Sequence, residues 1–183
     1  RGLGDVYKRQ VFYPLVRQRL TFRSVWFFAA LGYGTHGLLD ACTTYGTQLL
    51  WPLTNARIAG HNVSVIDPLF TLPLLVLLLI SAVRRQPRLA VYGFCWALSY
   101  LGFGLVQHQR ALSAAESIVS HRQHEPTRLE VKPGFANLLV WKALYEYEDR
   151  YYVDAVRVGI NPTYFPGEST AKFSAGRDFP FLI

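Results

Sequence analysis

The stretch LAVYGFCWALSYLGFGLVQHQ, at Leu89–Gln109, decides the fold class of this chain. It has 21 residues without a formal charge and lies between Arg88 and Arg110. A helix needs about 20 mostly apolar residues to cross the hydrocarbon core of a bilayer. The stretch therefore predicts a membrane-spanning helix, and the rest of the chain is interpreted outward from it.

Two further apolar stretches predict helices of the same kind. Val63–Val83 has a sufficient length and carries Asp67 near its start. Val25–Trp51 is longer and carries a histidine and an aspartate inside it, His36 and Asp40. We therefore expect an α-helical integral membrane protein with about three transmembrane helices.

The composition supports a membrane location. Hydrophobic residues make up 51% of the 183 residues and charged residues 17%, against roughly 25% charged in an ordinary soluble domain. This excludes a disordered chain, and two Cys exclude a disulfide scaffold. The net charge of +7 comes entirely from residues 1–106. Because the basic residues flank apolar runs, they indicate membrane lipid as a partner, not nucleic acid.

The basic clusters also predict an orientation. Arg17–Arg23 and Arg84–Arg88 contain most of the basic residues near the predicted helices. Positively charged loops stay on the cytoplasmic side of a membrane. We therefore expect a multi-pass protein whose C-terminal tail is extracytoplasmic.

The chain divides into three regions. Residues 1–10, RGLGDVYKRQ, resemble translated sequencing-adapter read-through, and the chain contains no Met. We interpret these ten residues as an artefact and expect an N-terminally truncated fragment. Residues 11–110 form the predicted transmembrane helical region, and residues 111–183 form a soluble tail.

The tail predicts a short helix followed by a small antiparallel β-rich region. Ala111–Ser120 has a helical pattern. Val140–Glu148 and Arg150–Val158 alternate apolar and polar residues, as the two strands of a hairpin do. Arg128–Lys132 is a candidate third strand. The Pro- and Gly-rich sequence after Gly159 predicts coil.

The pair formed by His36 and Asp40 is the strongest functional candidate. The two residues are four positions apart, so they share one face of a helix. Ionisable residues inside a membrane are costly and indicate function. A neutral imidazole with a carboxylate suits a divalent metal, with zinc the first choice, although further ligands are needed. A hydrogen-bonded pair that fastens helices together, or a proton path, would also use these residues.

Four neighbouring residues are weaker candidates. Thr35, Thr43 and Thr44 lie beside the pair and could orient a ligand or contact substrate. Asp67 suits the N-cap of a helix that starts at Pro68, and a contact with substrate is the alternative.

The run THGLLDACTTYGTQLLWPL, at Thr35–Leu53, resembles the T-H-x-L-L-D…T-x-x-G-T-x-L-x-W-P block of the bacterial membrane-bound metal-dependent hydrolases of the YdjM/YfhP type. Val65–Leu74 is also similar to that family, and Arg128–Pro133 is similar to the tail of a subgroup. The resemblance implies an inner-membrane protein with a metal site in which His36 and Asp40 are ligands.

The same resemblance implies further ligands in an H-R-G-x-T-H-S block and a P-D-x-D block, which these 183 residues do not contain. We therefore expect a metal-dependent hydrolase in the bacterial inner membrane, inactive as this fragment. A lipid or lipid-linked ester is the expected substrate class from the depth of the pair. The alternatives are an ion- or proton-coupled transporter that uses His36 and Asp40 as a relay, and a non-enzymatic membrane protein.

Overall fold

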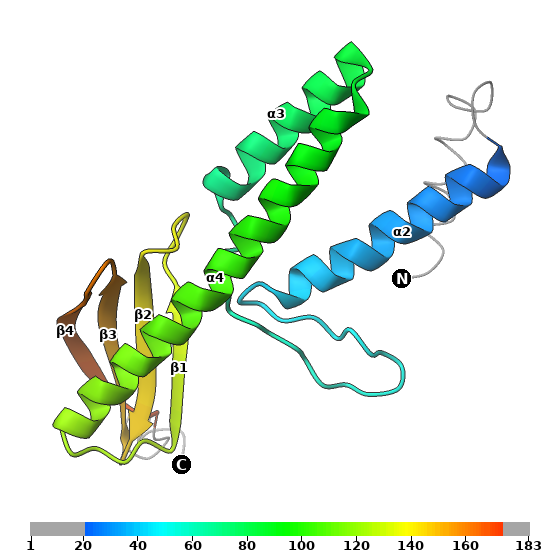
Figure 1. Cartoon of the computed structure of the whole chain (residues 1–183). Helices are drawn as coiled ribbons and strands as arrows, with labels where there is room; N and C mark the ends of the chain where they lie inside the picture. Colours follow the sequence, from blue (N-terminus) through cyan, green and yellow to red (C-terminus); the bar gives the residue numbers. More distant parts are fainter. Residues whose placement is uncertain (1–20, 174–183) are drawn as a thin grey trace.

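The computed structural model describes residues 21–173, which form three helices followed by four strands (Figure 1). The helices are α2 (Phe22–Ala41), α3 (Pro68–Arg84) and α4 (Pro87–His121). The strands are β1 (Arg128–Pro133), β2 (Val140–Tyr147), β3 (Arg150–Val158) and β4 (Pro162–Ala171). Residues 1–10, interpreted above as an artefact, lie outside the described residues.

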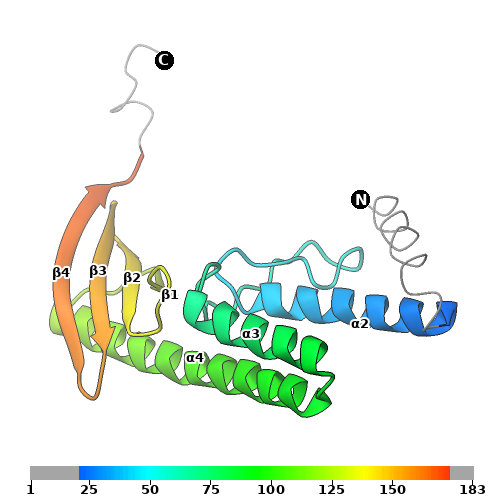
Figure 2. The same cartoon turned by 90° about the horizontal axis from the view of Figure 1, so that it is seen from above.

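Helix α4 connects the two halves of the molecule. It has 35 residues, which at 1.5 Å per residue gives a length of about 52 Å. Its N-terminal half runs antiparallel to α3, and its C-terminal half lies along the sheet (Figure 2). The short helix predicted at Ala111–Ser120 is therefore the continuation of the apolar helix that precedes it.

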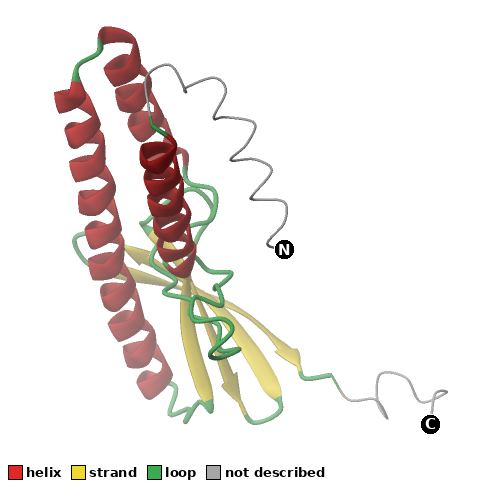
Figure 3. Ribbon diagram, turned by 90° about the vertical axis from the view of Figure 1, so that its right-hand side faces the viewer, coloured by secondary structure: helices red, strands yellow, loops and turns green. Residues whose placement is uncertain are grey.

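The sheet is antiparallel with the order β1-β2-β3-β4, and one of its faces packs on α4 (Figure 3). Ala111 and Ala115 are fully buried and four residues apart, so they form one small-residue face that lets the sheet approach closely. Alternate residues of the strands fill this core: Val131, Trp141, Ala143, Val156 and Val158.

The loop between α2 and α3 crosses α4 at Gly104. A Cβ atom at this glycine would lie 2.6 Å from the backbone oxygen of Asn62 and 3.2 Å from Val63 Cγ1. The loop is also bonded to the end of α2, because Gly60 N donates to Ala41 O at 2.7 Å. None of the residues of α2 itself is buried, and its ribbon stands apart from α3 and α4 in Figure 1.

The prediction of three transmembrane helices is wrong for the described residues, in which α4 is the one helix long and apolar enough to cross a membrane. Helix α3 has only 17 residues because Asp67 caps it and starts it at Pro68; at about 26 Å it is shorter than the hydrocarbon core of about 30 Å. Helix α2 ends at Ala41, and His36 and Asp40 lower its hydropathy. The predicted Val25–Trp51 span therefore ends ten residues early.

The prediction of coil after Gly159 is also wrong, because β4 pairs with β3 over this segment. Pro166 and Gly167 suggested coil from the sequence. In the structure β4 is an edge strand, where a proline needs no partner for its missing N–H. A shift of register between Val153 and Ala155 of β3 accommodates them. The predicted hairpin is present, and Arg128–Lys132 belongs to β1.

Candidate functional site

His36 and Asp40 form a pair on the last two turns of α2. His36 Nε2 lies 3.4 Å from Asp40 Oδ2, as expected for residues four apart on a helix. Their side chains are 68% and 49% exposed, so neighbouring elements do not cover the pair. An imidazole nitrogen and a carboxylate oxygen on one face of α2 can thus bind an ion or contact a further residue.

The three threonines beside the pair have different roles. Thr35 Oγ1 donates to the backbone oxygens of Leu31 and Gly32 at 2.9 and 3.1 Å, within its own helix. Thr43 Oγ1 donates to Asp40 O at 2.8 Å, and Thr43 N donates to the same oxygen at 3.0 Å. Thr43 therefore holds the backbone of Asp40 at the end of the helix. Thr44 lies half-buried in the turn that follows.

Asp67 is buried where the N-terminal end of α3 contacts α4. Its Oδ1 accepts hydrogen bonds from the backbone N–H groups of Leu69 and Phe70, at 3.1 and 3.3 Å. Its Oδ2 accepts one from the hydroxyl of Tyr100 at 2.6 Å. Both oxygens are thus used to start α3 and tie it to α4, which is the N-cap role considered from the sequence.

His61 lies on the loop that passes the end of α2. Its N–H donates to Thr43 O at 3.4 Å, and its ring atom Nδ1 is buried without a hydrogen-bond partner. Burial lowers the pKa of His61, and the positive charge of Lys132 lowers it further. Within residues 21–173, no group of three His, Cys, Asp or Glu side chains is close enough to hold a metal.

The sequence reasoning missed a polar cluster at the end of α4. Asp154 is buried on the inner face of β3 and accepts from Arg122 Nη1 at 2.8 Å and from Gly167 N at 2.8 Å. Arg122 also donates to the hydroxyls of Tyr145 and Tyr164. Burial alone would lower the pKa of Arg122, but the bonds to Tyr145 and Asp154 outweigh it and raise that pKa.

This cluster fastens the end of the helix to the sheet. A signal for it was present in the sequence, because the alternation of β3 places Asp154 on the same face as Val156 and Val158. A carboxylate at an inward position of a strand requires a buried partner. Arg122 directly follows the helix and supplies that partner.

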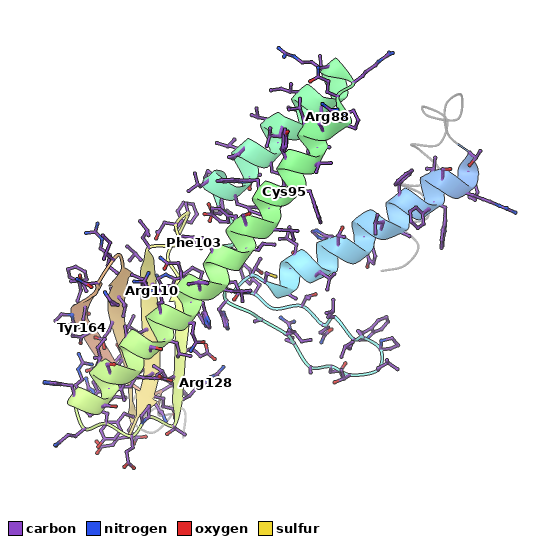
Figure 4. The ribbon with its side chains drawn as sticks, viewed as in Figure 1. Arg88, Cys95, Phe103, Arg110, Arg128 and Tyr164 are labelled. Atoms are coloured by element: carbon purple, nitrogen blue, oxygen red, sulfur yellow. The ribbon has the colours of Figure 1, made fainter. Side chains whose placement is uncertain are left out.

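A second polar contact joins the middle of α4 to the other end of the strands. Gln107 is buried, and its Nε2 donates to Leu138 O at 3.2 Å and to Val158 O at 2.9 Å. Arg110 donates to Gly159 O and Ile160 O at 2.6 and 2.9 Å. Figure 4 shows Arg110 on α4 near the end of the sheet at which β1 and β3 end and β2 and β4 begin. The sheet is therefore held at two points of one helix.

Comparison with known proteins gives the family. The model of the YdjM inner membrane protein family matches residues 7–111, more than half of the chain. The matched range contains α2, α3 and most of α4, including His36, Asp40 and Asp67. No curated protein and no solved structure matches the chain. The chain belongs to the YdjM inner membrane protein family.

Proposed function

We propose that this inner membrane protein is a metal-dependent hydrolase in which His36 and Asp40 are two of the metal ligands. One observation carries the proposal. An imidazole nitrogen and a carboxylate oxygen lie 3.4 Å apart on an uncovered helix face. The same i, i+4 spacing lets two side chains of a helix bind one zinc ion in zinc hydrolases.

The residues present fit a divalent metal as part of a site. Nitrogen and carboxylate oxygen are both zinc ligands, and four ligand positions are usual for that ion. His36 and Asp40 supply two, and Thr43 holds the backbone oxygen of Asp40. The other ligands would come from outside residues 21–173. A bound metal would supply a polarised water near neutral pH.

The surroundings of the pair favour a substrate from the membrane. Helix α2, which carries the pair, also exposes large apolar side chains: Trp26, Phe27, Phe28, Leu31 and Leu38. A lipid or lipid-linked ester can lie against such a surface while its polar group reaches His36 and Asp40. A small water-soluble substrate would gain nothing from these side chains.

We also propose that the sheet lies on the extracytoplasmic side. Arg84, Arg85 and Arg88 stand at the turn between α3 and α4, and basic residues favour the cytoplasmic side. Helix α4 would then carry the sheet across the membrane. With Cys42 and Cys95 replaced by Ala, labelling of an Asp149→Cys variant in intact cells by an impermeant maleimide tests this, since a cytoplasmic sheet would stay unlabelled.

Metal content tests the function. The protein is purified without chelator, and its zinc content is measured by elemental mass spectrometry. We expect near-stoichiometric metal in the wild type, and a loss of it in His36→Ala and Asp40→Ala. Asp149→Ala removes an exposed carboxylate far from α2 and should keep the metal.

A folded, metal-free wild type would overturn the proposal and favour the proton relay or a non-enzymatic role. Full metal content in both the His36→Ala and the Asp40→Ala variants would also overturn the ligand assignment. A substrate screen with lipid esters follows only after the metal result supports it.

A further inference from the structure

One end of the strands lies where the apolar part of α4 ends. The loops 134–139 and 159–161 both lie at this end of the sheet, because β1 and β3 end there and β2 and β4 begin there. Gln107 and Arg110 hold the two loops through backbone oxygens. Because Gln107 and Arg110 are three residues apart, both loops are held at the same helical turn of α4.

Both loops expose apolar side chains. Phe135 is 74% exposed, Leu139 48% and Ile160 96%. Removing apolar surface from water is favourable, so leaving three such side chains in water close together is unfavourable. We call Phe135, Leu139 and Ile160 the apolar edge.

The first of these loops has a fixed shape. Asn137 Oδ1 accepts from Leu139 N at 3.0 Å and from Val140 N at 2.7 Å, and its Nδ2 donates to Phe135 O at 3.0 Å. Gly134 N donates to Val140 O at 2.7 Å. Phe135 is thus presented by a preformed turn, and ordering it at a surface costs little further entropy.

The apolar edge continues the apolar surface of α4. Phe103, Leu105 and Val106 are half exposed or more, and they end one residue before Gln107. Beyond that point, Ala111 and Ala115 face the sheet instead. If α4 crosses the membrane, the bilayer surface lies near Gln107, at the height of the apolar edge.

The charges near this edge suit lipid phosphate groups. Lys142 and Arg157 are exposed on strands close to the loops, and Arg110 lies on α4 at the same height. The exposed acidic residues Glu148 and Asp149 occupy the turn between β2 and β3, at the opposite end of the strands. Cations close to an anionic membrane surface are attracted to its phosphate groups.

We propose that the apolar edge inserts into the lipid headgroup layer, so that the sheet stands on the membrane surface beside α4. Phe135, Leu139 and Ile160 contact the upper acyl chains, and Lys142 and Arg157 contact phosphate groups. Because the two loops are bonded to α4, this contact fixes the tilt of the sheet relative to the bilayer. The proposal does not depend on the metal site.

Spin labels in vesicles of phosphatidylethanolamine and phosphatidylglycerol test the contact. With Cys42 and Cys95 replaced by Ala, a nitroxide is attached to Phe135→Cys or Ile160→Cys in the whole chain. Phe103→Cys on α4 is the lipid-exposed reference, and Asp149→Cys at the opposite end of the strands is the aqueous reference. Collision rates with oxygen and with a water-soluble nickel chelate give the depth of each label.

We expect the labels at 135 and 160 to collide with oxygen more often, and with the chelate less often, than the label at 149. In vesicles of phosphatidylcholine alone, the difference from position 149 should shrink, since Lys142 and Arg157 lose their anionic partners. Labels that behave as position 149 does would overturn the proposal. Labels protected from both reagents would also overturn it, because protein and not lipid would then cover the edge.

Discussion

The hydroxyl of Tyr100 donates a 2.6 Å hydrogen bond to the carboxylate of Asp67, which caps α3. The bond joins two helices whose residues are 33 positions apart in the chain. Helix α3 thus begins where α4 can hold its first turn. This contact explains why the second predicted span is shorter than the apolar sequence that suggested it.

Replacing Asp67 should destabilise the protein more than replacing its partner. Asp67→Ala loses the cap, worth about 1–2 kcal/mol, and leaves the Tyr100 hydroxyl without its acceptor, at about 1–3 kcal/mol. Tyr100→Phe loses one bond, worth about 1 kcal/mol. Thermal unfolding in detergent measures both, and the double variant should lose less than the sum. Equal losses in the two single variants would contradict this account.

Two glycines of α4 should respond to alanine in opposite directions. Gly104→Ala places a methyl group 2.6 Å from the Asn62 carbonyl, so the loop must move and the protein should lose stability. Gly102→Ala meets nothing within 4 Å, and should gain up to about 1 kcal/mol from helix propensity. The unfolding temperatures of the two variants compare them directly. A stable Gly104→Ala variant would show that the loop does not pack there.

Breaking the Arg122–Asp154 pair should detach the end of α4 from the sheet. Removing one partner of a buried pair costs about 3–5 kcal/mol, and we expect the lower end because the Arg122 side chain is 26% exposed. Asp154→Asn keeps the shape and removes the charge. The control is Arg128→Ala on the outer face, whose side chain is 73% exposed and whose loss should cost about 0–1 kcal/mol. Denaturant unfolding of both variants gives the comparison.

His61 should make the protein less stable in mild acid. Folding lowers its pKa from the ordinary value of 6.5, through burial first and Lys132 second. The unfolded chain therefore binds a proton at a higher pH than the folded chain does. The free energy of unfolding keeps its full value above about pH 6.5. It falls as the pH drops below this value and through the lower pKa that His61 has in the folded chain.

The test compares unfolding of the wild type and of His61→Asn at about pH 7.5 and about pH 5.5. Asn tolerates the positive φ of 52° at this position. The wild type should lose more stability than the variant over this interval. Parallel losses would assign the acid sensitivity to other groups.

The sequence predicted the β-hairpin, the extra strand at Arg128–Lys132 and the placing of His36 and Asp40 on one helix face, because each depends on local periodicity. The N-cap role of Asp67, with α3 starting at Pro68, is confirmed as well. The sequence did not predict the end of α2 at Ala41, nor the bond from Tyr100 to Asp67, whose residues are 33 positions apart and do not share a window of 20 residues. The role of Asp154 depends equally on Arg122, 32 residues away.

The crossing at Gly104 and the two polar anchors of the sheet all lie on one uninterrupted helix, α4, or at the residue that directly follows it. A single residue inserted between Gly104 and Gln107 would turn everything after it by about 100° and shift it by about 1.5 Å. The glycine would still face the loop, while Gln107 and Arg110 would point away from the strands. This turn of α4 can therefore gain or lose residues only in steps that restore the helical phase.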